Sequence, residues 1–240
     1  MKKIFFIIVT AFSFLICNAQ KDIVNDPDVE IRNVNGSFTA IKISGGIDLF
    51  LSQDDKEVVA VSSNDARTKE AIKAVVENGT LRIYYDGDNK GWGNWKNRKM
   101  RAYVSFKTLE KLTASGACDV QVSGAISGNS FEMDMSGASD FKGTVKLSSL
   151  KIELSGASDI KIAGSVTTVI INSSGASDVK GYDLVSEICT AKASGASDIN
   201  ITVNKELNAH ASGASDIYYK GEGVIKESHT GGASTVAKKS

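Results

Sequence analysis

Residues 136–140 read Ser-Gly-Ala-Ser-Asp, and the same five residues return at 155–159, 174–178, 194–198 and 212–216. Residues 115–119 are the variant Ser-Gly-Ala-Cys-Asp, and residues 231–235 are a degenerate copy, Gly-Gly-Ala-Ser-Thr. We call each copy a corner phrase; their glycines, spaced 21, 19, 19, 20, 18 and 19 residues apart, are Gly116, Gly137, Gly156, Gly175, Gly195, Gly213 and Gly232. A near-constant period is typical of solenoids, because one repeat cannot bury its apolar side chains alone and its neighbours complete the core.

Apolar and polar residues alternate on both sides of each phrase glycine. Around Gly156, for example, the apolar positions are Leu150, Ile152, Leu154 and Ile160. A period of two indicates strands, and glycine suits the corner between them because it tolerates positive φ and close approach of another backbone. We therefore predict an all-β fold, a right-handed parallel β-solenoid (β-helix) of roughly 19–20 residues per coil. About 19 residues are too few for a four-stranded propeller blade.

Residues 1–19 have the pattern of a signal peptide. Lys2 and Lys3 precede an apolar run over 4–16, and Ala19 ends a small-residue exit. Acylation of Cys17, as in a lipoprotein, is the alternative, but Ile16 stands where such sites prefer a small residue. Export to the periplasm, the outer membrane surface or the extracellular space is expected, and no later segment reaches the roughly 18 apolar residues of a membrane span.

The rest of the chain divides into three parts. Residues 20–35 are polar and predicted to be a flexible lead-in, and residues 115–240 form the regular solenoid. Residues 36–114 are predicted to add irregular β coils with strands at 57–62, 80–85 and 100–106, in one continuous domain over 36–240. In this part Asn64 or Asp65 can cap a short helix that carries Ile72, Val75 and Val76 and stops at Gly79.

The corner phrases resemble those of a known family. Together with the stretch 37–48, Ser-Phe-Thr-Ala-Ile-Lys-Ile-Ser-Gly-Gly-Ile-Asp, and with Tyr-Lys-Gly at 219–221, they resemble the bacterial family described as "putative auto-transporter adhesin, head GIN domain". The resemblance extends from Gly36 to Val236. It implies an exported protein with a β-helix-like fold, and it brings no catalytic residues.

Charge and cysteine content restrict the possible partners and cross-links. Lys and Arg number 28, as do Asp and Glu, so no global field attracts nucleic acid. Cys118 and Cys189 fall three coils apart, about 14 Å at the spacing of stacked strands. A disulfide requires Cα atoms within about 7 Å, so two buried free thiols are predicted.

The phrase aspartates share one outward position on successive coils: Asp119, Asp140, Asp159, Asp178, Asp198 and Asp216. Lysines follow three of them two residues on, at 142, 161 and 180. Asp198 and Asp216 lack such a lysine, and a calcium ion could bridge them. The favoured interpretation is that each aspartate accepts backbone N–H groups at its own corner.

Two further groups of residues could bind a ligand. His210 and His229 occupy the same position on successive coils beside Glu227, a combination that could hold zinc, although a solvated strand face is the favoured interpretation. Trp92 and Trp95 lie in a polar loop over 86–99, where exposed indoles could stack on a glycan or an envelope or surface protein; alternatively, one indole covers the end of the coils.

The sequence contains no catalytic motif and implies no cofactor. We therefore expect a non-catalytic exported module for adhesion, recognition or scaffolding. The alternative is a polysaccharide lyase or hydrolase on a β-helix, which would require long loops that carry clustered charged residues. The oligomeric state is left open.

Overall fold

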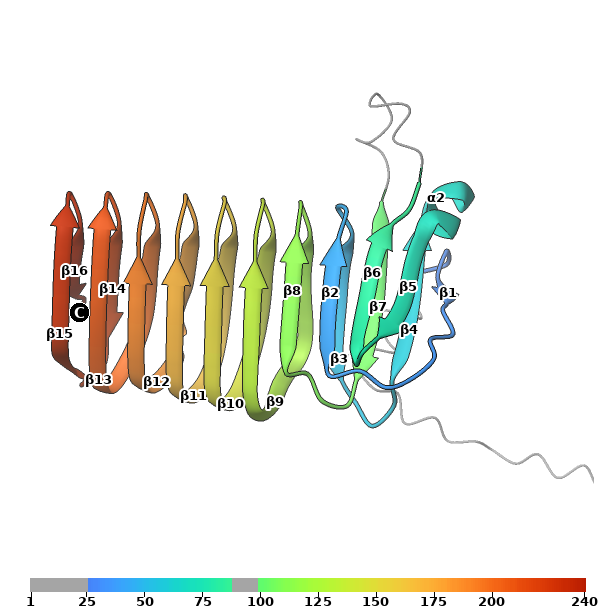
Figure 1. Cartoon of the computed structure of the whole chain (residues 1–240). Coiled ribbons are helices and arrows are strands. Elements are labelled where there is room, and N and C mark those ends of the chain that lie inside the picture. Colours follow the sequence, from blue (N-terminus) through green and yellow to red (C-terminus); the bar gives the residue numbers. More distant parts are fainter. Residues whose placement is uncertain (1–25, 88–98) are drawn as a thin grey trace, which may run out of the picture.

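The computed structural model describes residues 26–87 and 99–240. In these residues sixteen strands form one continuous sheet that winds into a solenoid of about seven turns, with one short helix near the N-terminal end (Figure 1). The predicted all-β parallel solenoid is therefore confirmed. No helix among the described residues has the length and apolar character that a bilayer crossing requires.

The regular part consists of five long strands that stack in parallel. They are β9 (Asp119–Met135), β10 (Asp140–Leu154), β11 (Asp159–Ser173), β12 (Asp178–Ala193) and β13 (Asp198–Gly213). Each strand bends midway, so its first half lies in one wall of the solenoid and its second half in the other (Figure 1). We call these the first wall and the second wall. Between β10 and β11 the register holds on both walls, as the pairs Phe141 with Ile160 and Ile152 with Ile171 show.

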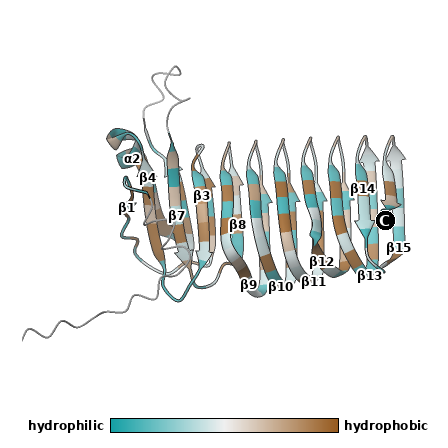
Figure 2. Cartoon of the chain, turned by 180° about the vertical axis from the view of Figure 1, so that it is seen from behind, coloured by the Kyte–Doolittle hydropathy of each residue, from teal (hydrophilic) through white to brown (hydrophobic). Residues whose placement is uncertain are grey.

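The core lies between the two walls and continues through every coil. In β9–β13 the predicted inward residues before the phrase glycines are all buried, and so are those four positions after the glycines, from Val120 to Ile217. Seen from behind, the first wall shows brown apolar bands that alternate with hydrophilic ones along the strands (Figure 2). The period-two pattern therefore predicted the inward and outward faces correctly, because a parallel in-register stack keeps equivalent positions on one face.

The corner phrases stack through backbone and side-chain hydrogen bonds. Gly156 has φ +82°, and the N–H of Ala157 donates to the carbonyl of Gly137 on the preceding coil at 2.7 Å. Ser158 is fully buried; its Oγ donates to the carbonyl of Ser155 at 3.2 Å and accepts the N–H of the preceding coil's Ser139 at 3.3 Å. The fourth residue of the phrase thus satisfies polar backbone groups that the tight corner buries.

The N-terminal coils do not stack in chain order. They comprise β2 (Ala40–Ser44), β3 (Asp48–Gln53), β6 (Thr80–Tyr85), β7 (Met100–Phe106) and β8 (Lys111–Ser115). Strand β2 lies between β6 and β8, while β3 lies between β7 and β9. The coil formed by β2 and β3 therefore sits between two coils that come later in the chain.

Antiparallel strands and the helix occupy the N-terminal end. The helix α2 (Ala66–Ala71) is capped by Asp65, whose side chain accepts the N–H of Thr68 at 2.8 Å. The predicted helix is too long, because β5 (Ile72–Glu77) is a strand that pairs antiparallel with β6. Asn78 and Gly79 both have positive φ between these strands, as in the tight hairpin turn that Asn-Gly favours. This turn and the β-branched residues before it outweigh the helical spacing.

Part of the predicted lead-in is attached to the solenoid. Strand β1 (Glu30–Ile31) pairs antiparallel with β4 (Val58–Ser63), which in turn pairs with β7. Asp26 is buried and accepts a hydrogen bond from the hydroxyl of Tyr103 at 2.7 Å. Residues 26–31 therefore differ from the expected loose segment, because they extend the first wall by one more strand.

The C-terminal end is an open edge of the sheet. Strands β14 (Asp216–Lys220) and β16 (Thr235–Lys238) extend the first wall, and β15 (Val224–Gly232) extends the second. Every residue of β15 is exposed. Between β13 and β15 the register shifts by one residue: Leu207 pairs with Ile225, but Asn208 pairs with Glu227. This end consequently differs from the N-terminal one, which antiparallel strands and a helix cover.

Candidate functional site

Two rows of charged side chains cross the first wall over β9–β12. The aspartates form one row, in which Asp119 pairs with Asp140 and Asp159 pairs with Asp178. Lys142, Lys161 and Lys180 form the second row, two residues further along the same strands, after Gln121 on the first coil. The residues between the two rows point into the core, so both rows face solvent on one surface.

The aspartates contact the neighbouring coil rather than their own corner. Asp140 Oδ1 accepts the N–H of Asp159 at 3.3 Å, and Asp198 Oδ1 accepts that of Asp216 at 3.2 Å. Lys180 Nζ lies 2.8 Å from Asp159 Oδ2, also across the coils. The expectation of contacts within one corner is therefore wrong for these residues. The buried serine already serves the corner, and parallel stacking brings the next coil's N–H within reach of the carboxylate.

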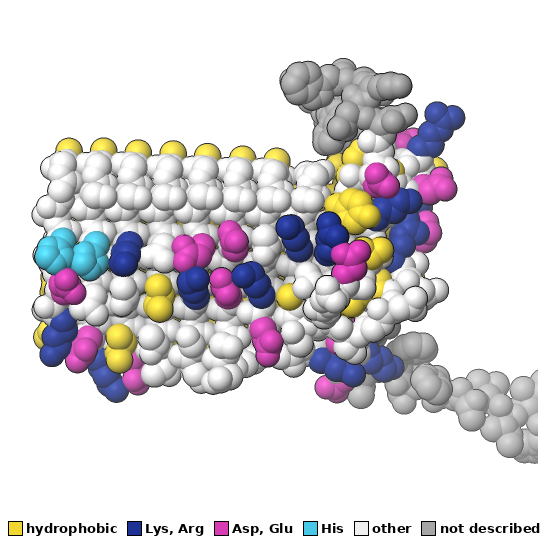
Figure 3. Space-filling view, viewed as in Figure 1, with side chains coloured by type: hydrophobic (Ala, Val, Ile, Leu, Met, Phe, Trp, Pro, Cys, Tyr) yellow, Lys and Arg dark blue, Asp and Glu magenta, His cyan; other side chains and the backbone are white. Residues whose placement is uncertain are grey.

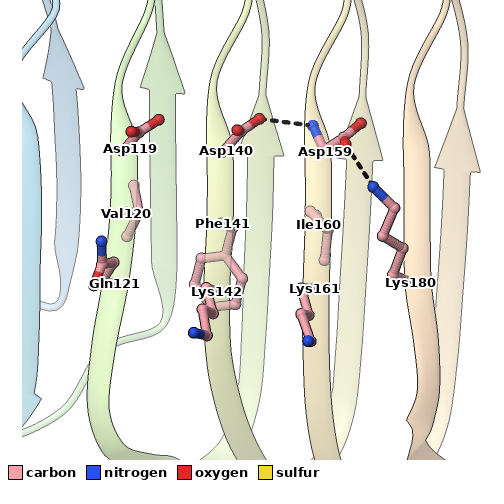
Figure 4. A pocket seen from close by; sticks show the side chains of 10 residues that line it. All are labelled: Asp119, Val120, Gln121, Asp140, Phe141, Lys142, Asp159, Ile160, Lys161 and Lys180. Carbon is pink, nitrogen blue, oxygen red and sulfur yellow. Dashed lines mark hydrogen bonds and ion pairs between the residues drawn. The ribbon is translucent and has the colours of Figure 1, made fainter.

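A shallow groove of about 290 Å³ follows these rows (Figure 4). Its lining residues are Asp119, Val120, Gln121, Asp140, Phe141, Lys142, Asp159, Ile160, Lys161 and Lys180. A second hollow of about 290 Å³ continues it along the strands and shares Gln121, Lys142 and Lys161. Lys142 and Lys161 are exposed, and within the described part of the chain neither forms an ion pair. The groove therefore offers two ammonium groups and a row of carboxylates to a ligand.

The second wall carries charged residues that compensate one another (Figure 3). Glu132 lies 3.3 Å from Lys111 and 3.4 Å from Lys151, and Lys151 lies 3.2 Å from Glu153. Burial pushes the pKa of Glu132 up, but the two lysines outweigh it and the pKa is lowered. The charges of this cluster are compensated by one another within the protein, unlike those of the two unpaired lysines of the groove.

The two histidines lie together at the C-terminal end of the second wall (Figure 3). His210 of β13 pairs in register with His229 of β15, and their rings stack with centroids 4.9 Å apart. Glu227 Oε1 lies 2.9 Å from His229 Nε2 and 4.0 Å from His210 Nε2. The structure thus brings together the three residues that the sequence singled out.

Asp198 and Asp216, the candidate calcium ligands, are adjacent on the first wall. One oxygen of Asp198 accepts the N–H of Asp216, and Asp216 Oδ2 accepts the hydroxyl of Tyr218 at 2.8 Å. Each carboxylate therefore already has a donor from the protein. Among the described residues, the single group of three or more metal-ligating side chains with converging donor atoms is His210, Glu227 and His229.

The cysteines are unsuited to act as nucleophiles. Cys118 and Cys189 are both buried and unpaired. Burial raises the pKa of both thiols, that of Cys189 to about 12, so neither forms a thiolate near neutral pH. Cys118 donates to the carbonyl of Ser115 at 3.3 Å and so replaces the serine of the phrase. Both thiols belong to the core.

A buried polar cluster near the N-terminal end was not predicted from the sequence. Asp26 accepts hydrogen bonds from Tyr103 and, at 3.4 Å, from Arg101. Burial raises the pKa of Asp26, but the hydrogen bonds, that of Tyr103 foremost, outweigh it and lower the pKa. Burial, with Asp26 nearby, raises the pKa of Tyr103 to about 12. No signal in the sequence connects the three residues, because they join the segment before β1 to β7.

Some predicted features lie outside the described residues. These are Trp92, Trp95, the signal peptide over 1–19 and the alternative lipid site at Cys17. They remain predictions.

Solved bacterial structures share the fold. A protein of Bacteroides fragilis NCTC 9343 described as a "putative adhesin" is 20% identical, with a TM-score of 0.80 over 88% of this chain and 96% of that one. A "putative lipid binding protein" of Parabacteroides distasonis ATCC 8503 is 22% identical, with a TM-score of 0.66 over 90% and 98%. A "putative adhesin" of the same strain is 20% identical, with a TM-score of 0.67 over 88% and 97%. These likenesses concern the fold.

No curated protein matches the chain. A family model does match it, over residues 37–223. This range begins just before β2, includes the out-of-order N-terminal coils and all five long strands, and ends just before β15. The chain belongs to the family described as "putative auto-transporter adhesin, head GIN domain".

Proposed function

We propose that the protein is a non-catalytic, exported recognition module that serves adhesion or scaffolding at the cell surface or in the periplasm. The family description and two of the structural neighbours support an adhesin-like role. The observation that carries the proposal is the groove on the first wall. It lies on in-register coils whose core and corners are fully packed, so its side chains stand on a rigid support.

The polar groups of the groove suit a glycan. The carboxylates of Asp119, Asp140 and Asp159 can accept hydrogen bonds from sugar hydroxyls, while the ammonium groups of Lys142 and Lys161 can donate to sugar oxygens. Acceptors and donors alternate between two rows and repeat at each coil, about 4.8 Å apart. A chain of sugars that runs across the coils would meet the same pattern several times. Trp92 and Trp95 could add stacking contacts.

Binding to a glycan array tests the proposal. The double variant Lys142→Ala/Lys161→Ala should lose binding, whereas Lys107→Ala/Lys146→Ala should retain it. The control removes the same charge from two exposed lysines, one of them on the same strand β10 as Lys142. Equal binding by the two double variants would remove the groove as the site. A Trp92→Ala/Trp95→Ala variant separates the contribution of the predicted aromatic loop.

Three further measurements distinguish other partners and activities. Pull-down from an envelope fraction would detect a protein ligand, and vesicles would detect the lipid affinity that the name of one relative states. Turnover of a bound polysaccharide into shorter products would overturn the non-catalytic role and favour the alternative, a polysaccharide lyase or hydrolase.

A further inference from the structure

The last two coils of the second wall bring three potential metal ligands to one point. His210 and His229 stand side by side because β13 and β15 are parallel and in register at these positions. Glu227 precedes His229 by two residues on β15, so its side chain emerges on the same face. One ligand atom from each residue lies within 4.8 Å of the other two.

The register shift in β15 is what creates this convergence. Leu207 pairs with Ile225, and the shift at Lys226 then places Glu227 opposite Asn208 and His229 opposite His210. Without the shift, the residue opposite His210 would be Ser228, and the two imidazoles would face opposite sides of the sheet. The extra residue therefore pairs the histidines.

The donor set suits a divalent transition metal. Two imidazole nitrogens and one carboxylate oxygen are the protein ligands found in open zinc sites, where a fourth position stays free for water or another donor. Glu227 Oε1 already lies 2.9 Å from Nε2 of His229 and 4.0 Å from Nε2 of His210. The imidazoles and the carboxylate are all accessible from solvent, so side-chain rotations alone can bring the three atoms onto an ion.

We propose that His210, Glu227 and His229 form a binding site for one divalent transition metal ion, with Zn²⁺ as the best match. The ion would join β13 to β15 and thereby fasten the exposed last strand of the second wall to the preceding coil. Solenoids require protection of their terminal repeats, and this edge strand otherwise has backbone hydrogen bonds on one side only.

Zinc titration of tag-free protein tests the site. Isothermal titration calorimetry, or competition with a chromophoric chelator, should show one Zn²⁺ bound per chain. His210→Ala, His229→Ala and Glu227→Gln should each weaken binding by about 100-fold or more, at least as much as the loss of a residue that only orients a ligand. Glu206→Gln is the matched control, because it removes a partly exposed carboxylate from the same strand as His210, one that pairs with Lys226 and not with the histidines, and it should leave the affinity unchanged.

Hydrogen exchange gives a second readout. Zn²⁺ should slow amide exchange in residues 224–232 of the wild type and of Glu206→Gln, and should not do so in the three ligand variants. All substituted side chains are at least partly exposed, so circular dichroism should show the variants to be folded. Absence of saturable binding by the wild type, or binding that survives both histidine substitutions, would overturn the proposal. Neither result depends on glycan recognition by the first wall.

Discussion

Replacing Gly156 with alanine tests the close stacking of the corners on which the solenoid depends. A Cβ atom at this position would lie 2.4 Å from the carbonyl oxygen of Gly137, 3.0 Å from its nitrogen and 3.2 Å from its carbonyl carbon. All three are backbone atoms, and the same carbonyl accepts the N–H of Ala157 at 2.7 Å. Relief of the clash therefore requires the two coils to separate at a corner that is hydrogen-bonded.

The magnitude follows from two contributions. A left-handed conformation costs an alanine about 1–2 kcal/mol relative to the right-handed one, and the reduced entropy of the unfolded chain offsets about 0.4–1 kcal/mol of this. Overpacking adds about 1–3 kcal/mol. We expect Gly156→Ala to lower the free energy of unfolding by about 3 kcal/mol.

Gly124→Ala isolates the conformational contribution. Gly124 lies in β9 with φ +80°, close to the +82° of Gly156, but nothing lies within 4 Å of a Cβ at this position. Its replacement should cost only about 1 kcal/mol. Urea unfolding followed by circular dichroism would measure both variants. A difference below about 0.5 kcal/mol between them would refute the reasoning, because the clash would then be relieved without loss of stability.

Substitutions at two further positions test the buried polar groups. Ser158→Ala should destabilise the protein by about 1–2 kcal/mol, because the N–H of Ser139 loses its acceptor. Ser158→Cys should restore part of this stability, because Cys118 fills the same position of another phrase. Unchanged urea midpoints would contradict the role of the hydroxyl. Asp26→Asn tests a pH dependence: hydrogen bonds lower the pKa of Asp26 in the folded state, so its ionised form stabilises the fold above the unfolded pKa of about 3.9, and this contribution disappears as the pH falls through the lower folded value. The gap in Tm between wild type and Asp26→Asn should therefore shrink from about pH 6 to pH 3, whereas a constant gap would show that ionisation of Asp26 is not involved.

The regular coils could be predicted from the sequence because each position repeats under the same constraint. Ile152 and Ile171 pair across β10 and β11 at the same offset from their phrase glycines, and both are buried. A period of two, repeated at a fixed spacing, leaves one arrangement that buries all such residues together. Cys118 in the serine position fits the same rule.

The N-terminal coils and the contacts between rows could not be predicted in this way. Residues 44–48, Ser-Gly-Gly-Ile-Asp, resemble the corner phrase, and Ser44 pairs with Ser115 of the next coil, but nothing in the sequence indicates that β2 lies between β6 and β8. The spacing of Ile72, Val75 and Val76 predicts a helix, but in β5 Ile72 and Val76 face the core while Val75 lies on the other face, and only the Asn78–Gly79 turn indicates the hairpin. The pairing of Lys180 with Asp159 depends on the side-chain reach between coils, which a linear pattern does not specify.

Specific recognition by such a fold has to come from the outward positions. At every coil the inward residues must fill the core and the corner residues must pack and hydrogen-bond against the neighbouring coil. A change at Gly156 or Ser158 therefore affects two coils at once. The outward row three residues before each phrase glycine is free to vary, and it reads Asp134, Glu153, Asn172, Lys192, His210 and His229 in register along the second wall. This row changes from acidic to basic along the solenoid, although the same core lies beneath all of its residues. Its charge pattern can therefore change one coil at a time without loss of packing. The histidine pair belongs to this row, and the two unpaired lysines of the groove occupy an outward position on the first wall. Both proposed ligand sites therefore use outward side chains rather than the glycines and buried serines of the corners.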